Sequence, residues 1–247
     1  RIDPLDNTML LVTYAPGTLD EAVQRFVLAN VDSIFFDGGF GDDQLIVDAA
    51  VLIPVLAAGG MGNDILVGGG ASDVLVGGTG RDTLNGNGTP GGVSDRDALN
   101  GGDGDDTYVV DDTSDHVVIN ELPGAAAGSD TLDVRAATTA VTVELGNQTT
   151  FGSVVVTHGG NTIENIHGSV TNTVEARAIT TQGGELSLAG NIVTFNGTEI
   201  SLVNVSGLFV DMPGGVVTVA EAASFAGNVT IKASSLVVAA SLGADNL

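Results

Sequence analysis

A tandem array of nine-residue segments constrains the fold of this chain more than any other feature. Three copies follow one another directly, at residues 59–67, 68–76 and 77–85. Each begins with two glycines, places an aspartate sixth and places a leucine eighth. Further copies lie at 38–46 and 101–109, and a version with six additional residues ends at Asn100. A short fixed period of this kind predicts a solenoid in which each repeat packs on its neighbours.

Each position of the repeat has a physical role. Glycine at the first, second and fourth positions permits positive φ, and therefore a tight turn that gathers several backbone carbonyls. The aspartate adds an anionic oxygen, and Ca²⁺ takes six to eight oxygen ligands in proteins. The eighth position places one aliphatic side chain inward in each short strand. The residues predicted to face the core in this way are Leu45, Leu66, Leu75, Leu84 and Leu99.

The array resembles the repeats-in-toxin family, also called RTX or haemolysin-type calcium-binding proteins. The resemblance covers roughly residues 30–170 and implies a parallel β-roll, in which two repeats form one coil and turns of stacked coils bind several Ca²⁺ ions. The metal-binding residues it implies here are Gly39, Gly41, Asp43, Gly60, Gly62, Asp64, Gly69, Asp73, Gly78, Gly80, Asp82, Asp97, Gly102, Gly104, Asp106 and Asp115. A series of glycine-rich turns without metal is the alternative.

Spacing assigns these turns to two edges of the roll. A coil of two repeats has eighteen residues, the separation of Asp64 and Asp82, and longer separations match the insertions. One edge therefore carries Asp43, Asp64, Asp82 and Asp106, and the other carries Asp73, Asp97 and Asp115. Two positions depart from the pattern: Ala71 replaces the fourth glycine of its repeat, which predicts a weaker site, and Arg81 occupies an outward position.

The remaining sequence predicts an all-β chain in three parts. Residues 1–37 are expected to form entry strands, 38–134 the calcium-binding roll, and 135–247 a metal-free β-helix or another β-rich domain, because short Val- and Thr-rich runs recur there between Gly, Asn and Ser. A β-sandwich would give the same spacing. Near the N-terminus, residues 18–27 fit a capped helix and residues 23–28 fit a strand; the strand is favoured because it leads directly into the first repeat.

Composition limits the function. The net charge of −24 argues against nucleic acid as a partner. The apolar run at 45–58 is too short to span a membrane. The absence of Cys excludes disulfides and thiolate chemistry. No catalytic motif is present, so we expect no enzyme. We expect an extracellular or cell-surface bacterial protein: a calcium-stabilised segment of a filament, surface layer or adhesin. The alternative is the calcium-binding secretion module of an exported enzyme or toxin. The last coils carry few charges, which predicts self-association or packing with a longer parent protein.

Overall fold

The chain is nearly all-β in a computed structural model, and it forms a parallel β-solenoid of about seven turns. The structure describes residues 2–6, 9–14, 22–88, 96–111, 116–120, 128–144, 148–151, 154–157, 163–168, 174–179, 185–195, 198–238 and 242–246. No helix in these ranges is long and apolar enough to cross a membrane. The chain divides into two compact units, residues 1–128 and 129–247.

The first unit contains an antiparallel sheet and the repeat array. Its elements are β1 (Ile2–Asp6), β2 (Met9–Tyr14), β3 (Ala22–Val27), a 3-10 helix (Leu28–Asn30), β4 (Ile34–Phe40), β5 (Gln44–Ile46), β6 (Val55–Met61), β7 (Ile65–Val67), β8 (Val74–Thr79), β9 (Thr83–Asn85), β10 (Asp97–Asp103), β11 (Thr107–Val109) and β12 (His116–Ile119). Strand β3 confirms the strand interpretation of the segment before the first repeat.

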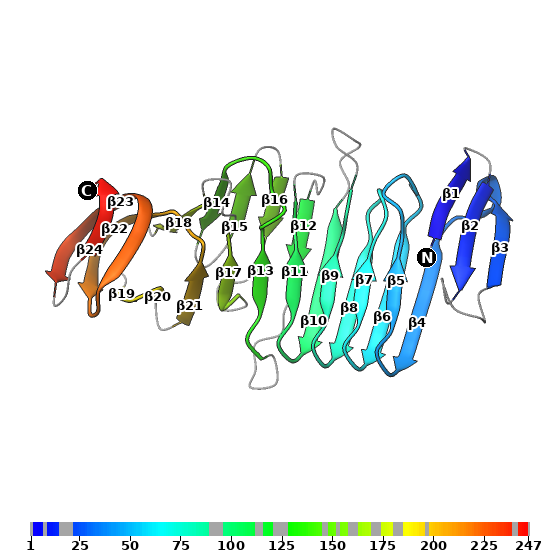
Figure 1. Ribbon diagram of the computed structural model, residues 1–247, viewed down its shortest axis with the longest axis horizontal. Coiled ribbons are helices and arrows are strands. Elements are labelled where there is room, and N and C mark those ends of the chain that lie inside the picture. Colours follow the sequence, from blue (N-terminus) through cyan, green and yellow to red (C-terminus); the bar gives the residue numbers. More distant parts are fainter. Residues whose placement is uncertain are drawn as a thin grey trace. The chain divides into compact units, whose positions relative to one another are not determined.

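The repeats form two parallel ladders, and successive coils of the array follow one another from β4 to β12 in Figure 1. One ladder runs β4–β6–β8–β10–β12 and the other β5–β7–β9–β11. Because paired residues of parallel strands point to the same face, the core consists of columns of equivalent side chains. The predicted core leucines lie in these columns, and each is at most 4% exposed. One column is Leu45, Leu66, Leu84 and Tyr108, and the other contains Ala57, Leu75, Leu99 and Ile119.

Strands β1, β2 and β3 form the antiparallel sheet, in that order. Its contact with the roll is made by β1. Ile2 forms a parallel bridge with Val47, its carbonyl accepts a hydrogen bond of 2.8 Å from the N–H of Asp48, and its side chain is buried. The sheet is therefore tied to the first coil of the array through backbone hydrogen bonds.

The second unit continues in β-structure. Its strands are β13 (Thr131–Asp133), β14 (Val141–Glu144), β15 (Gln148–Phe151), β16 (Val154–Thr157), β17 (Asn165–His167), β18 (Val174–Ile179), β19 (Glu185–Ala189), β20 (Ile192–Phe195), β21 (Thr198–Val203), β22 (Gly207–Val219), β23 (Ala223–Val238) and β24 (Leu242–Asn246). Several of the strands predicted from Val- and Thr-rich runs are present. The strands β22 and β23 are longer than predicted, because each joins two of these runs in one continuous strand.

Parallel pairing dominates the second unit too. Strands β13, β17 and β21 form one parallel ladder, and β14, β18, β22 and β23 form another. The structure therefore excludes a β-sandwich and supports the β-helix interpretation. Antiparallel strands β15, β16 and β20 interrupt the parallel pattern as hairpin extensions, which the strand spacing did not predict.

A buried carboxylate forms an ion pair near the start of the second unit. The guanidinium of Arg135 donates hydrogen bonds to both carboxylate oxygens of Asp133, including one of 2.9 Å from Nε to Oδ1. Burial raises the pKa of Asp133, but the hydrogen bonds and charge of Arg135, with a contribution from His167, outweigh burial and hold this pKa below its usual value. Ionised Asp133 is therefore the form that the fold stabilises.

Replacing Arg135 by alanine should lower the free energy of unfolding at neutral pH by about 1 kcal/mol, a modest value because the Arg135 side chain is 63% exposed. The folded pKa of Asp133 lies below its unfolded value of 3.8. The stabilisation by Arg135 is therefore complete above pH 3.8 and is lost as the pH falls through the folded pKa of Asp133. Urea unfolding at neutral pH and at about pH 2.5 measures the effect. Lys232→Ala, which removes an exposed ion pair, is the control. A pH-independent loss in Arg135→Ala would contradict this assignment.

Candidate metal centre

Four turns on one side of the roll share a single backbone conformation. We call this side the first edge; its turns are residues 38–43, 59–64, 77–82 and 101–106. The second and fourth glycines of every turn have positive φ, between 90° and 132°. These residues are Gly39, Gly41, Gly60, Gly62, Gly78, Gly80, Gly102 and Gly104. The conformation explains why these two positions are glycine in every repeat of this edge.

The glycines are stacked so closely that no side chain would fit between coils. A Cβ atom on Gly60 would collide with the carbonyl oxygen of Gly39, and one on Gly78 would collide with that of Gly60. The fourth glycines form a similar column, in which Gly80 approaches the carbonyl of Gly62. Carbonyl oxygens of successive turns are therefore brought together along the first edge.

The sixth-position aspartates form a hydrogen-bonded ladder along the same edge. Oδ1 of Asp64 accepts the N–H of Asp43 at 2.7 Å, and Oδ1 of Asp82 accepts the N–H of Asp64 at 2.7 Å. The N–H of Asp82 donates in the same way to Oδ1 of Asp106 at 2.7 Å. The spacing of eighteen residues and its insertions thus places these four aspartates in one column. Asp64, Asp82 and Asp106 are almost completely buried.

Three carboxylates of this ladder have a second oxygen that receives no hydrogen bond from the described part of the chain. Oδ2 of Asp43, Asp64 and Asp82 is buried and has no hydrogen-bond partner among the described residues. Oδ2 lies against the first glycine of its own turn, where a Cβ atom on Gly59 would collide with Asp64 and one on Gly77 with Asp82. A buried carboxylate oxygen without a partner carries a large desolvation cost. The first edge therefore presents anionic oxygens that require compensation.

Electrostatics at the middle of the ladder agrees with this requirement. Burial is the main cause that raises the pKa of Asp82, and the charge of Asp64 raises it further. The hydrogen bond from the Asp64 N–H opposes the shift without reversing it. The fold alone therefore disfavours the ionised form of Asp82.

Fifth-position residues form a second, exposed ladder outside the first. Oδ1 of Asp42 accepts the N–H of Asn63 at 2.7 Å, and Oδ1 of Asn63 accepts the N–H of Arg81 at 2.9 Å. Arg81 is exposed, as its outward position predicts. This outer ladder joins neighbouring coils through neutral and charged acceptors that remain in contact with solvent.

The opposite side of the roll, the second edge, contains the turns at residues 68–73 and 86–97. It does not repeat the first-edge geometry: neither Gly69 nor Ala71 has positive φ, and Asn87, in the second position, has a φ of 69°. Asp73 and Asp97 lie in one column, because the N–H of Asp73 donates to Oδ1 of Asp97 at 2.9 Å. Asp115, predicted to follow them, lies outside the described residues.

No group of three or more His, Asp or Glu side chains converges on one point within the described ranges. A cation on the first edge would therefore be bound by carboxylates of adjacent turns together with backbone carbonyls. Two further polar residues lie in the second unit. Glu164 accepts the N–H of Asp130 at 2.9 Å. His167 is paired in register with Asp133 on the neighbouring strand. The turn at Glu164 thus uses a carboxylate as the aspartates do, a role that its sequence context did not indicate.

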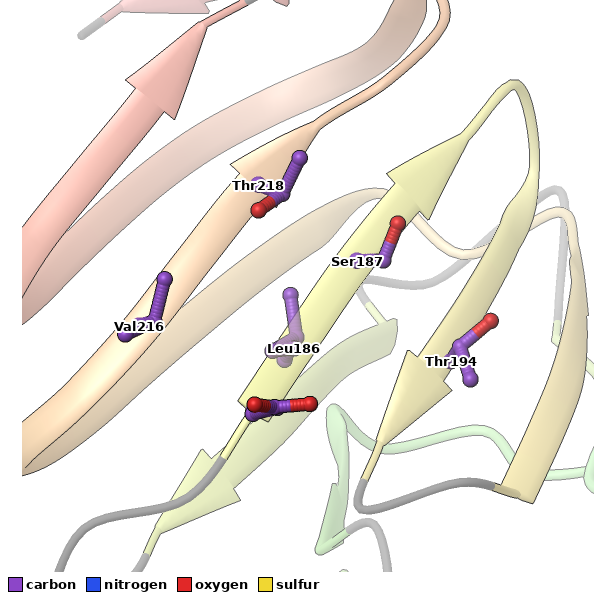
Figure 2. A pocket seen from close by; sticks show the side chains of 6 residues that line it. Leu186, Ser187, Thr194, Val216 and Thr218 are labelled. Carbon is purple, nitrogen blue, oxygen red and sulfur yellow. The ribbon is translucent and has the colours of Figure 1, made fainter.

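Two shallow grooves lie on the second unit. Figure 2 shows one, with Ser187 and Thr218 on adjacent parallel strands and Thr194 on the hairpin strand beside them. Glu185, Leu186 and Val216 complete its lining. The other groove is lined by Ser129, Glu164, Asn165, Ile192, Glu199 and Ser201. Hydroxyl side chains contribute to the lining of both grooves.

The chain was compared with protein-family models and with curated proteins. No family model matches it, and no curated protein matches it. The fold is consistent with a β-roll on its own geometry.

A pair of glycine variants tests the stacking of the first edge. Gly39 and Gly60 both have positive φ, but only at Gly60 would a Cβ atom meet the backbone of the adjacent coil; at Gly39 nothing lies within 4 Å. Gly39→Ala should lower the free energy of unfolding by about 1–2 kcal/mol, and Gly60→Ala by roughly twice that or more. Thermal unfolding of both variants in one buffer gives the comparison. Equal losses would show that coils are not in contact at these glycines.

Proposed function

We propose that this chain is a calcium-stabilised structural segment of an extracellular filament, surface layer or adhesin, of the RTX type that its repeats resemble. The observation that carries the proposal is the column of carboxylates in which the buried second oxygens of Asp43, Asp64 and Asp82 have no donor among the residues that the structure describes. Without a cation, each of these anions is desolvated beside another anion, and the repulsion between neighbours is uncompensated.

Calcium fits the donors that the first edge offers. Ca²⁺ prefers oxygen ligands in flexible geometry, mixes carboxylates with backbone carbonyls, and takes six to eight of them. A softer metal would require His or Cys, and the chain has no Cys. The residues that would hold the ions are the carboxylates of Asp43, Asp64, Asp82 and Asp106 with carbonyls of the stacked glycines. Several ions would then alternate with coils along the edge.

The ions would act on stability rather than on a substrate. Ca²⁺ between two coils would neutralise their carboxylates and join segments eighteen or more residues apart in sequence. An extracellular site suits this role because free calcium is high outside cells, and weak sites suffice there. A net charge of −24 keeps such a protein soluble while it raises the need for bound cations.

A calcium-binding secretion module of an exported enzyme or toxin is the alternative function. It would use the same first edge for the same folding step. The observation that favours a structural segment is the second unit, in which parallel coils continue for more than a hundred residues after the array. A secretion module requires only the coils that fold on export. The two functions differ in what the parent protein carries beside the solenoid.

The first test is calcium-coupled folding. In chelator, the full chain should lose much of its β-sheet circular dichroism, and millimolar calcium should restore it. Asp64→Asn should raise the calcium concentration needed for folding by roughly tenfold or more, because it removes one anionic ligand from the ladder. Asp211→Asn, which removes an exposed carboxylate 3.7 Å from Lys232, is the matched control and should behave like the wild type. An unchanged β-signal in chelator would remove calcium from the proposed function.

Exposed side chains on β23 support self-association of the chain. Leu236 is paired in register with Val217, and Val238 with Val219. Val217 and Val219 are completely buried in the core, whereas Leu236 and Val238 are 51% and 57% exposed. Core-facing side chains are therefore exposed on this half of β23, and the pairing of β24 within the described residues is with the first half, from Ala223 to Asn228.

We propose that a second copy of the chain covers this face of β23. The strand half from Val229 to Val238 carries a single charge, that of Lys232, in a chain whose net charge is −24. Two copies are repelled over most of their surfaces, and this half-strand, which has no acidic residue, is a place where they can approach. An open strand edge beside an open core is also the surface that pairs most readily with another β-chain.

Variants on neighbouring residues test this assembly. Val238 lies in the core-facing row, and Val237, 49% exposed, lies in the outward row beside it. Light scattering in calcium should detect association of the wild type and of Val237→Asp, and monomers for Val238→Asp, because only Val238 would be buried against a second copy. A wild-type chain that stays monomeric at high concentration in calcium would remove self-association, and equal association of both variants would remove this face as the interface.

A further inference from the structure

The turn at Asp73 on the second edge is already satisfied by protein donors. Oδ1 of Asp73 accepts the N–H of Val55 at 2.7 Å, and Oδ2 accepts the N–H of Gly69 at 2.7 Å. On the first edge, Oδ2 of Asp64 and Asp82 accepts no hydrogen bond from the described residues. The Asp73 turn therefore differs from the first-edge turns: at Asp73 the backbone donates to both carboxylate oxygens.

The difference begins with the backbone of the turn. Gly69 does not have the positive φ of the first-edge glycines. Its N–H donates a hydrogen bond to the carboxylate of Asp73, four residues further along the chain. The next N–H, of Gly70, donates to the carbonyl of Val51 at 2.9 Å. A Cβ atom on Gly69 would lie 2.6 Å from the Val51 carbonyl oxygen and 3.2 Å from a methyl carbon of Val47, so the turn is closely packed. Ala71, in the place of the fourth glycine, accompanies this different path.

A side-chain amide bridges the carbonyls on this edge. Nδ2 of Asn87 donates to the carbonyl of Gly68 at 3.2 Å and to the carbonyl of Val47 at 3.4 Å. These carbonyls belong to two successive coils, which is the arrangement that a bridging cation would require. Asn87 is held in position by its own left-handed conformation, with φ of 69°, and by the hydrogen bond of 2.8 Å from its N–H to Oδ1 of Asn85. An amide NH₂ has two donors and suits two carbonyls.

We infer that Asn87 closes the Asp73 turn to metal, so that calcium loads the first edge while the turn at 68–73 is held together by hydrogen bonds alone. The inference rests on the proposed calcium binding of the first edge and removes Gly69 and Asp73 from the metal ligands that the repeat pattern predicts. Asn87 occupies the second position of its repeat, where the other copies have glycine. It acts as a specificity-determining residue, because its amide takes the place of a cation between coils.

Bound calcium per chain, measured by equilibrium dialysis of the full chain, tests the inference. Asp73→Asn should keep the wild-type number of ions and lose thermal stability, because the hydrogen bonds to Val55 and Gly69 are weakened. Asp64→Asn should lose bound calcium. Loss of the same amount of calcium in both variants would overturn the inference and leave the proposed function intact. A wild-type chain that binds no calcium would instead overturn both the proposed function and the inference.

A second variant, which should gain a calcium site, tests the inference even if Asp73→Asn does not fold. Asn87→Gly restores the glycine of the repeat and removes the amide that bridges Gly68 and Val47, so it should bind about one additional calcium ion. Asn191→Gly is the matched control: Asn191 also lies in a turn, and its Nδ2 also donates to a backbone carbonyl, that of Leu202 at 3.4 Å. The control should bind the wild-type number of ions. The wild-type number in Asn87→Gly as well would overturn the inference.

Discussion

Each coil of the first edge is joined to the next by a hydrogen bond from an aspartate N–H to the carboxylate of the following aspartate. This bond, 2.7 Å long between Asp43 and Asp64, uses one oxygen of each carboxylate and fixes the register of the whole array. It also determines where the other oxygen lies: buried against the first glycine of the turn. The stacking of coils and the cation binding that we propose thus arise from one interaction, because the geometry that aligns the strands also desolvates the anions.

Neutral side chains join several coils of the second unit, in addition to the carboxylate of Glu164. Oγ of Ser206 accepts the N–H of Val174 at 2.9 Å and donates to the carbonyl of the same residue at 2.9 Å. Nδ2 of Asn165 donates to Oγ of Ser129 at 3.0 Å. A hydroxyl or an amide satisfies a backbone group without leaving a charge behind. The fall in acidic residues along the sequence therefore matches a change in how coils are connected within each unit.

Much of the array could be predicted from sequence because its period is short and its roles are local. The core leucines, the eighteen-residue register and the first-edge column of aspartates follow from counting, since every coil repeats the one before. The antiparallel strands β15, β16 and β20 could not be predicted in this way, because an alternating run has the same pattern in a hairpin as in a coil. The merging of separate runs into β23 was missed for the same reason: its glycine at 227 reads as a break.

The second edge shows why a repeat pattern alone does not fix a binding site. Asp73 and Asp82 occupy the same position of adjacent repeats, yet the N–H of Gly69 reaches Asp73 and no described N–H reaches Oδ2 of Asp82. The difference follows from the two substitutions at Ala71 and Asn87, which change backbone conformation and hydrogen bonding rather than the carboxylate itself. A carboxylate in a glycine-rich turn becomes a metal ligand only where the backbone leaves it unsatisfied. For the calcium binding that we propose, the residues around the aspartate would therefore decide between a metal and a hydrogen bond, and a single amide would close one turn while the neighbouring turns keep their sites.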